Sequence, residues 1–228
     1  MSEILTITSL SAVIANKSVL NGVSAKLKPS QIMAIIGANG GGKSSLAQVL
    51  LGNPEYEIKQ GEIVYDGVDL FTLNVDERAR RGLYVAWQNP VTIPGVSVFA
   101  LCKAAYEARG EKIDNFSEFK QKLEKLALEV GLTELHIGRF VNDGFSGGEK
   151  KRLELLQLLL LKPKLVVLDE IDSGLDKSGR ELIIKIIKQL KDGGTSFIII
   201  SHYEQLIEKI KAEIVMEMEN GQLLTRIS

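Results

Sequence analysis

Residues 32–44 read IMAIIGANGGGKS, in which a continuous apolar run passes directly into a glycine-rich turn. The run Ile32 to Ile36 predicts a strand that is buried on both faces of a parallel sheet. Residues 37–44 match the phosphate-binding pattern G-x-x-x-x-G-K-[S/T]. From Lys43 to Leu51 the pattern is helical and it closes at Gly52, a good carboxyl cap. Strand, glycine loop and helix together predict a site for a nucleoside triphosphate.

Each part of this loop has a chemical use in holding phosphate. Glycines let backbone N–H groups converge on phosphate oxygens, and the helix N-terminus adds partial positive charge. Lys43 is expected to bridge the outer phosphates and Ser44 to ligate magnesium, whereas a plain glycine-rich turn would not require this Lys-Ser pair. The predicted nucleotide-binding residues of the loop are Gly37, Ala38, Asn39, Gly40, Gly41, Gly42, Lys43, Ser44 and Ser45.

A second acidic motif follows the apolar run Leu165 to Leu168. Asp169 is expected to hold magnesium, directly or through water, as the metal carboxylate that a phosphate loop needs. Glu170, one residue further on, is placed to polarise the water that attacks the terminal phosphate. Acidic pairs are common at strand ends, so the assignment depends on the presence of the phosphate loop.

The composition is that of an ordinary globular protein, with 45% hydrophobic and 25% charged residues in 228. A net charge of -1 provides no overall basic field that would attract nucleic acid. No secretion signal is visible at the N-terminus, and the most apolar segment, Leu153 to Leu161, is far shorter than the ~20 residues of a membrane span. We therefore expect a cytoplasmic protein with no nucleic-acid partner and no direct membrane insertion.

The remaining pattern predicts an α/β fold with a mostly parallel sheet. A further buried strand at Phe197 to Ile200 follows an amphipathic helix at Gly179 to Leu190, which implies right-handed crossovers. Short alternating stretches with turn signals predict antiparallel strands at Ile4 to Ile7, Val23 to Leu27 and Gly61 to Val68.

Helix formers dominate between Val96 and Phe140, with an exposed connection predicted at Arg109 to Asn115. We expect residues 1–228 to form one domain. The predicted nucleotide-binding core, with its antiparallel β subdomain, consists of residues 1–95 and 155–228. The predicted helical subdomain, residues 96–154, is inserted into this core.

The stretch Phe145 to Glu149, FSGGE, is the most discriminating part of the helical region. Two glycines beside Ser146 allow a second anion to approach the backbone closely. Ser146 and Glu149 also form the pattern of a capping box that would begin a helix. Both uses are compatible, because a capped helix N-terminus is itself a phosphate site.

Together these motifs resemble the ATP-binding-cassette (ABC) ATPases over nearly the whole chain. Residues 37–44 resemble their Walker A loop, residues 165–170 their Walker B motif, and residues 146–149 their signature sequence. The resemblance implies a P-loop NTPase with an ABC-type core, ATP and Mg²⁺ as ligands, and an ATP-dependent homodimer. In that dimer each nucleotide lies between the loop of one copy and the signature of the other.

The resemblance also assigns roles to single residues. It implies that Gln88 and His202 act in catalysis beside Glu170, and that Gln88 contacts magnesium together with Ser44 and Asp169. It adds four signature residues and a residue of the loop 173–176 to the nucleotide site, namely Ser146, Gly147, Gly148, Glu149 and Asp176.

Several stretches resemble one branch of the family more narrowly, SufC, the ATPase of Suf iron–sulfur cluster assembly. The stretches are residues 56–58, 90–96, 144–152, 169–176 and 196–203, and Asp172 in particular is shared. This branch implies a SufB/SufD-like scaffold protein that docks on the helical subdomain, here through Asn89 to Leu101. An ATP-binding subunit of a membrane transporter stays open as the alternative. No cluster-ligand role is assigned to Cys102 or His136, because one cysteine cannot form a four-thiolate site.

Overall fold

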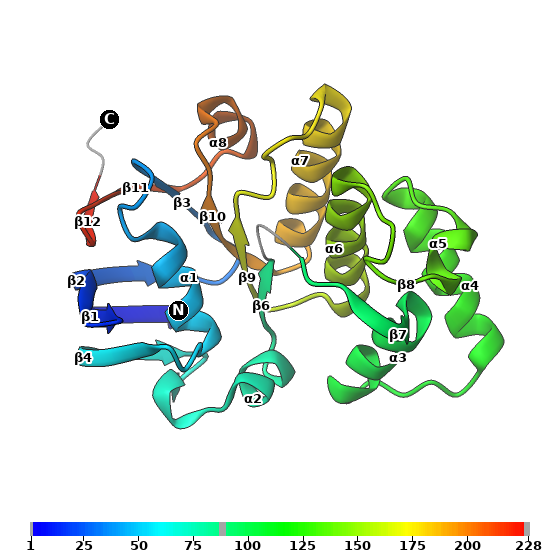
Figure 1. The fold of residues 1–228 in the computed structure, drawn as a ribbon, viewed down its shortest axis with the longest axis horizontal. Coiled ribbons are helices and arrows are strands. Elements are labelled where there is room, and N and C mark those ends of the chain that lie inside the picture. The colour runs from blue at the N-terminus through cyan, green and yellow to red at the C-terminus, as the bar shows by residue number, and fades with distance from the viewer. Residues whose placement is uncertain (1, 87–89, 226–228) are drawn as a thin grey trace.

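The computed structural model describes residues 2–86 and 90–225. In this part of the chain a central sheet lies between a smaller antiparallel sheet and a group of helices (Figure 1). All neighbouring strands of the central sheet pair in parallel except β11 and β12. The prediction of an α/β fold with a mostly parallel sheet is confirmed. In spatial order the strands are β12 (Gln222–Thr225), β11 (Ile214–Glu219), β3 (Ile32–Ile36), β10 (Ser196–Ile200), β9 (Leu165–Asp169) and β6 (Leu83–Ala86).

The antiparallel sheet contains one error of prediction. Gly61 to Val68 was expected to be a single strand, but the chain reverses at Asp66 and Gly67. Both residues have positive φ, 47° and 76°, which is the geometry of a tight hairpin turn. An Asp-Gly pair between apolar residues signals such a turn, so the prediction was wrong. The strands, in spatial order, are β2 (Lys17–Leu27), β1 (Leu5–Ile14), β4 (Tyr56–Tyr65) and β5 (Val68–Asp69).

The helices occupy both sides of the central sheet (Figure 1). Residues 109–115 connect two helices, as predicted, and a short antiparallel pair, β7 (Ile93–Ser97) and β8 (Phe140–Val141), closes the helical group. The helices are α1 (Lys43–Leu51), α2 (Val75–Arg80), α3 (Val98–Ala108), α4 (Phe116–Glu129), α5 (Glu134–Gly138), α6 (Gly147–Leu161), α7 (Lys177–Asp192) and α8 (Glu204–Ile210), with a 3-10 turn η1 (Leu70–Thr72).

The central sheet separates two hydrophobic cores. Along β9, Leu165 and Val167 face a core shared with α1 and the antiparallel sheet, whereas Val166 and Leu168 face a core shared with α6 and the other helices. This alternation follows from the two-residue period of a strand. Burial on both faces explains why β3, β9 and β10 are continuous apolar runs.

The helical region does not have a core of its own. Leu123 of α4 and Leu132 belong to the same cluster as the sheet residues, joined through the leucines of α6. The predicted boundary between residues 154 and 155 falls inside α6, so the division into subdomains stays a prediction. In the described part of the chain, none of the helices is both long and apolar enough to cross a bilayer.

Candidate nucleotide site

The phosphate loop is shaped by close contact with the backbone of two neighbouring strands. A Cβ atom on Gly37 would lie 2.2 Å from the carbonyl oxygen of Met218 in β11, and one on Gly42 would lie 2.7 Å from that of Val19 in β2. Both glycines have positive φ, 135° and 111°. Since real Cβ contacts are longer than 3 Å, no other residue fits either place without moving backbone. The loop also accepts a hydrogen bond at the Gly41 carbonyl from the Gly221 N–H, at 2.8 Å.

Lys43 lies inside this loop. Its Nζ donates to the carbonyl oxygens of Gly37 at 2.7 Å and Ala38 at 2.9 Å, and the residue is buried. Burial lowers the pKa of Lys43, while the nearby charges of Glu170 and Asp169 act in the opposite direction. An ammonium group held at the mouth of α1, where no side chain caps the helix, is suited to an anionic ligand.

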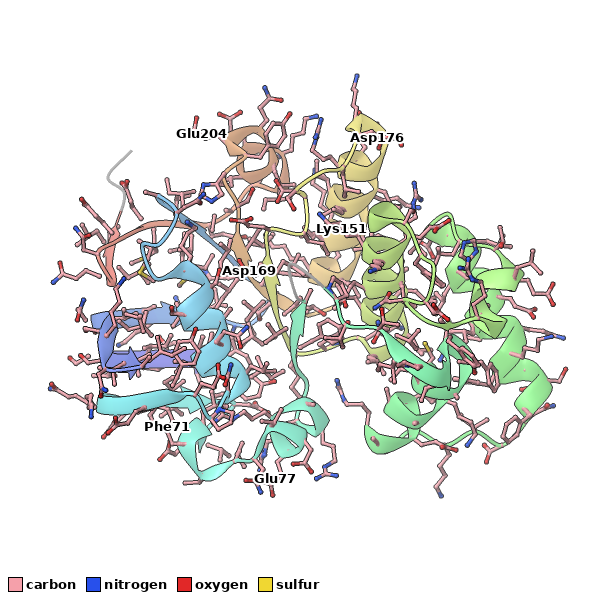
Figure 2. The ribbon with its side chains drawn as sticks, in the orientation of Figure 1. Phe71, Glu77, Lys151, Asp169, Asp176 and Glu204 are labelled. Atoms are coloured by element: carbon pink, nitrogen blue, oxygen red, sulfur yellow. The ribbon has the colours of Figure 1, made fainter. Side chains whose placement is uncertain are left out.

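Asp169 is the last residue of β9 and lies near the middle of the molecule (Figure 2). Its carboxylate is buried, and Oδ1 has no hydrogen-bond partner in the described part of the chain. Burial raises the pKa of Asp169, and a hydrogen bond with Ser44 acts against this rise. Leaving a buried carboxylate oxygen unpartnered is costly. A cation would compensate it, so the pair of oxygen donors, Ser44 and Asp169, fits Mg²⁺.

The described residues contain no group of three or more His, Cys, Asp or Glu side chains that could hold a metal ion. Protein sites bind Mg²⁺ with one or two carboxylates, while substrate phosphates and water supply the other ligands. Two protein oxygens beside a phosphate loop are therefore sufficient.

Glu170 follows Asp169 in a strained conformation. Its φ is 51°, in the left-handed region that few residues other than glycine adopt. The Glu170 N–H donates to the Ile200 carbonyl of β10 at 3.0 Å, and its Oε1 lies 3.0 Å from His202 Nε2. Such strain concentrates at functional sites. The structure thus brings together Lys43, Asp169, Glu170 and His202, which the sequence places up to 159 residues apart.

The loop that carries His202 is tied to the segment after Glu170. Ser201 Oγ donates to Asp172 Oδ2 at 2.9 Å and accepts from the Tyr203 N–H at 2.9 Å. Asp172 and Ser201 are both buried. These bonds hold the residues on either side of His202, so Asp172 and Ser201 orient its loop. In the sequence, Asp172 stands out only through the family resemblance, and no local pattern marks Ser201.

Helix α6 also reaches this segment. Lys151 Nζ donates to the carbonyl oxygen of Ser173, and it donates to the Ser173 hydroxyl at 3.1 Å. Burial lowers the pKa of Lys151, against the charges of Asp172 and Glu170. Helix α6, which begins within the signature sequence, is therefore linked to the loop that follows Asp169 and Glu170.

The predicted capping box at the start of α6 is present. Glu149 N–H donates to Ser146 Oγ at 3.2 Å, and Ser146 N–H donates to Glu149 Oε2 at 2.8 Å. Gly147, the first residue of the helix, faces open space, since a Cβ atom there would meet nothing within 4 Å. Asp176 caps α7 in the same manner by accepting from the Gly179 N–H at 2.8 Å. Gln88 lies outside the described residues.

Comparison with known proteins agrees with this geometry. Residues 20–173 match the family described as "ABC transporter". The chain is 44% identical over 225 residues to a probable ABC transporter ATP-binding protein of Streptococcus pyogenes, covering 97% of this chain and 88% of the relative. It is 38% identical over 226 residues to a probable ATP-dependent transporter of Synechocystis, covering 97% and 88%.

Solved structures of cassettes have the same fold. An ATP-binding subunit of an ABC transporter superposes with a TM-score of 0.83 at 24% identity, covering 96% of this chain and 88% of the other. The ATP-binding cassette MJ0796, solved as a dimer bound to ADP and Pi, gives 0.83 at 18% identity, covering 96% of both chains. The phosphate loop, the acidic pair and this fold define an ATP-hydrolysing P-loop protein. The chain belongs to the ABC ATPase family.

Proposed function

We propose that two copies of this chain pair head to tail around MgATP, and that hydrolysis there drives iron–sulfur cluster assembly on a SufB/SufD-like scaffold. The main observation that supports the paired site is the geometry of residues 146–149, called here the signature turn. The capping box fully forms this turn, yet Gly147 faces open space. A nucleotide held by a second copy would occupy that space, and the cassette MJ0796 is itself a dimer bound to ADP and Pi.

Within the site the residues have distinct roles in this proposal. Residues 37–45, which include Lys43, bind the phosphates in one copy. The second copy completes the pocket with Ser146 to Glu149 and Asp176. Ser44, Asp169 and Gln88 would hold Mg²⁺, which when bound neutralises charge on the phosphate oxygens.

Glu170 is the general base in this proposal. It accepts a proton from water as that water attacks the terminal phosphorus, and the bond to the bridging oxygen breaks to leave ADP and phosphate. His202, at 3.0 Å from Glu170 Oε1, orients this carboxylate, and Gln88 positions the water.

The paired site is tested with Glu170→Gln. This variant should bind ATP without turning it over and should accumulate as a dimer in size-exclusion chromatography with ATP. Adding Ser146→Ala should prevent the dimer while nucleotide binding by the monomer is retained, whereas adding Lys43→Ala should remove binding itself. Hydrolysis by Glu170→Gln at the wild-type rate would exclude Glu170 as the base.

The scaffold and the transporter assignments differ in what docks on the helical subdomain, residues 96–154 with the preceding segment. Two features support the scaffold: the SufC-like stretches around Asp172, and the surface of residues 90–101, where Val91 is 70% exposed and Pro94 is exposed. The names of the relatives, which include probable transporters, support the second candidate, the ATP-binding subunit of a membrane transporter.

An anaerobic pull-down with mass spectrometry separates these two candidates. We expect a SufB/SufD-like scaffold to be captured in the cytoplasmic fraction, and Val91→Asp to reduce its capture at least tenfold. Val75→Asp is the matched control, because Val75 is also exposed, at 45%, but begins α2, which lies outside the predicted helical subdomain and its docking segment. Capture of a membrane permease by the wild type, lost in Val91→Asp, would establish the transporter assignment instead.

A further inference from the structure

His136 contacts the signature turn from a neighbouring helix. It belongs to α5, and its Nε2 lies 3.2 Å from Glu149 Oε1 in the first turn of α6. The ring also packs edge-on against Phe145, with 5.4 Å between centroids. The other carboxylate oxygen of Glu149, Oε2, accepts the Ser146 N–H of the capping box. Both oxygens of Glu149 are thus engaged, one within the turn and one with His136.

The hydrogen bonds of the ring define its tautomer. Thr133 N–H donates to His136 Nδ1 at 3.0 Å, and Thr133 Oγ1 lies 2.8 Å from the same nitrogen. A backbone N–H can only donate, so Nδ1 must be the acceptor and carries no proton. The proton of the neutral ring is therefore on Nε2, from where it is donated to the Glu149 carboxylate. Accepting from Ser146 and His136 also lowers the pKa of Glu149.

This chain of bonds runs from the backbone of Thr133, the N-cap of α5, to the signature serine Ser146. Thr133 holds His136, His136 holds Glu149, and Glu149 holds the Ser146 backbone. Hydrogen bonds to a charged acceptor are stronger than neutral ones. Since a capping box has only two reciprocal bonds, a third contact from outside the helix restricts the rotamer of Glu149 and with it the turn.

We infer that His136 is a positioning residue for the signature turn, acting through Glu149. The inference rests on the proposed role of Ser146 in the nucleotide site of the partner. It also explains why position 149 holds a glutamate. Two donors, the Ser146 N–H and His136 Nε2–H, face this side chain, and a glutamine would offer only one acceptor and would turn its own donor toward one of them.

The test uses His136→Leu and His136→Gln in the Glu170→Gln background, with ATP-driven dimerisation and ATP binding by the monomer as separate readouts. Leucine removes both polar contacts, and glutamine carries an N–H the same number of bonds from Cα as imidazole Nε2. His136→Leu should weaken dimerisation about tenfold, the size expected for a lost charge-assisted bond, with monomer affinity for ATP unchanged within about twofold. His136→Gln should restore most of the dimer. Equal dimerisation of leucine, glutamine and wild type would overturn the inference.

A double-mutant cycle with Glu149→Gln tests the same link without depending on His136→Leu alone. Glu149→Gln should weaken dimerisation where His136 is present and should cost several-fold less in the His136→Leu background, because coupled residues are not additive. Additive effects would overturn the inference. If the leucine variants do not fold, the dimerisation of His136→Gln is compared with that of His136→Asn instead. Asparagine keeps an acceptor for Thr133 but does not reach Glu149, so equal dimerisation by these two would contradict the inference.

Ser146→Ala, measured in parallel, separates this inference from the proposed function. A normal dimer in Ser146→Ala would refute the paired site and the inference with it. Loss of the dimer in Ser146→Ala together with a normal dimer in His136→Leu would refute only the role of His136.

Discussion

The phosphate loop and the signature turn both depend on consecutive glycines, but their glycines have different surroundings. A Cβ atom on Gly37 or Gly42 would be within 2.7 Å of a backbone oxygen of the same chain. A Cβ atom on Gly147 would meet nothing within 4 Å, and one on Gly148 would meet only Leu175, at 4.0 Å. At Gly37 and Gly42, glycine is therefore required by the folded chain itself. In the signature turn the folded chain makes no such demand, and the proposed function assigns this open space to a nucleotide held by a second copy.

The largest expected effect is that of Gly37→Ala. A Cβ atom would lie 2.2 Å from the Met218 oxygen at a φ of 135°, so the loop and β11 would have to separate. We expect a loss of about 4 kcal/mol in the free energy of unfolding, at the upper end of single-residue effects. Urea denaturation without nucleotide measures it.

Gly40→Ala is the matched control for this change. Gly40 also has positive φ, 78°, but a Cβ atom there meets nothing within 4 Å. Only the cost of the left-handed conformation applies, about 1 kcal/mol. If the two alanine variants unfold at the same urea concentration, close packing against β11 is not what makes glycine necessary at position 37.

The second largest expected effect on stability concerns α1 and α6, the helices that follow the phosphate loop and the signature turn, because different buried groups anchor them. The end of α1 is held by the buried Arg78, whose guanidinium donates to the carbonyls of Leu73, Val49 and Leu50. Helix α6 instead crosses the core with a buried carboxyl, Glu154, which accepts from Tyr84 Oη at 2.9 Å. Burial raises the pKa of Glu154 to about 7, opposed by the hydrogen bond from Tyr84.

The pH dependence of stability follows from this pKa. In the unfolded chain Glu154 titrates near its ordinary value, about 4.3. Between that pH and about 7 the folded protein binds more protons at Glu154 than the unfolded chain, so the free energy of unfolding falls as pH rises through this window. The loss is complete above pH 7 and absent below pH 4.

Glu154→Gln should remove this dependence because an amide oxygen still accepts from Tyr84 but does not titrate. The stability of the variant relative to wild type should increase by about 2 to 3 kcal/mol from pH 5 to pH 8. Urea denaturation of both proteins across this range measures the difference. A constant difference would mean that Glu154 is not a buried acid in the folded state.

The phosphate loop was predictable from the sequence because its constraints are local. The apolar run, the glycines and the Lys-Ser pair are contiguous, and the predicted bounds of β3 and α1 agree with the structure. The single strand predicted at Gly61 to Val68 is wrong although the signal against it is also local, because the Asp-Gly pair inside the stretch forms a turn. β7 pairs with β8 across more than 40 residues, a contact that no local pattern encodes.

The signature region was predictable only in part, for the same reason. The capping box joins residues three apart, Ser146 and Glu149, and was predicted. The third contact comes from His136, which lies thirteen residues from Glu149 in another helix. Its sequence context shows only a lone histidine in a region rich in helix formers. Such contacts depend on tertiary packing and become visible only in the structure.

The smallest expected effect on stability is that of Gly147→Ala, and it tests the comparison most directly. Gly147 begins α6 in open space, and alanine forms helices better than glycine. We expect the free energy of unfolding to increase slightly, by about 0.5 kcal/mol, while ATP turnover falls because the new methyl group enters the space that the proposed function assigns to the second copy's nucleotide. Gly138→Ala at the end of α5 is the control, since Gly138 also meets nothing within 4 Å and belongs to no predicted site. Normal turnover by Gly147→Ala would mean that the signature glycine is not kept free for a partner, and the contrast with Gly37 would then have no functional meaning.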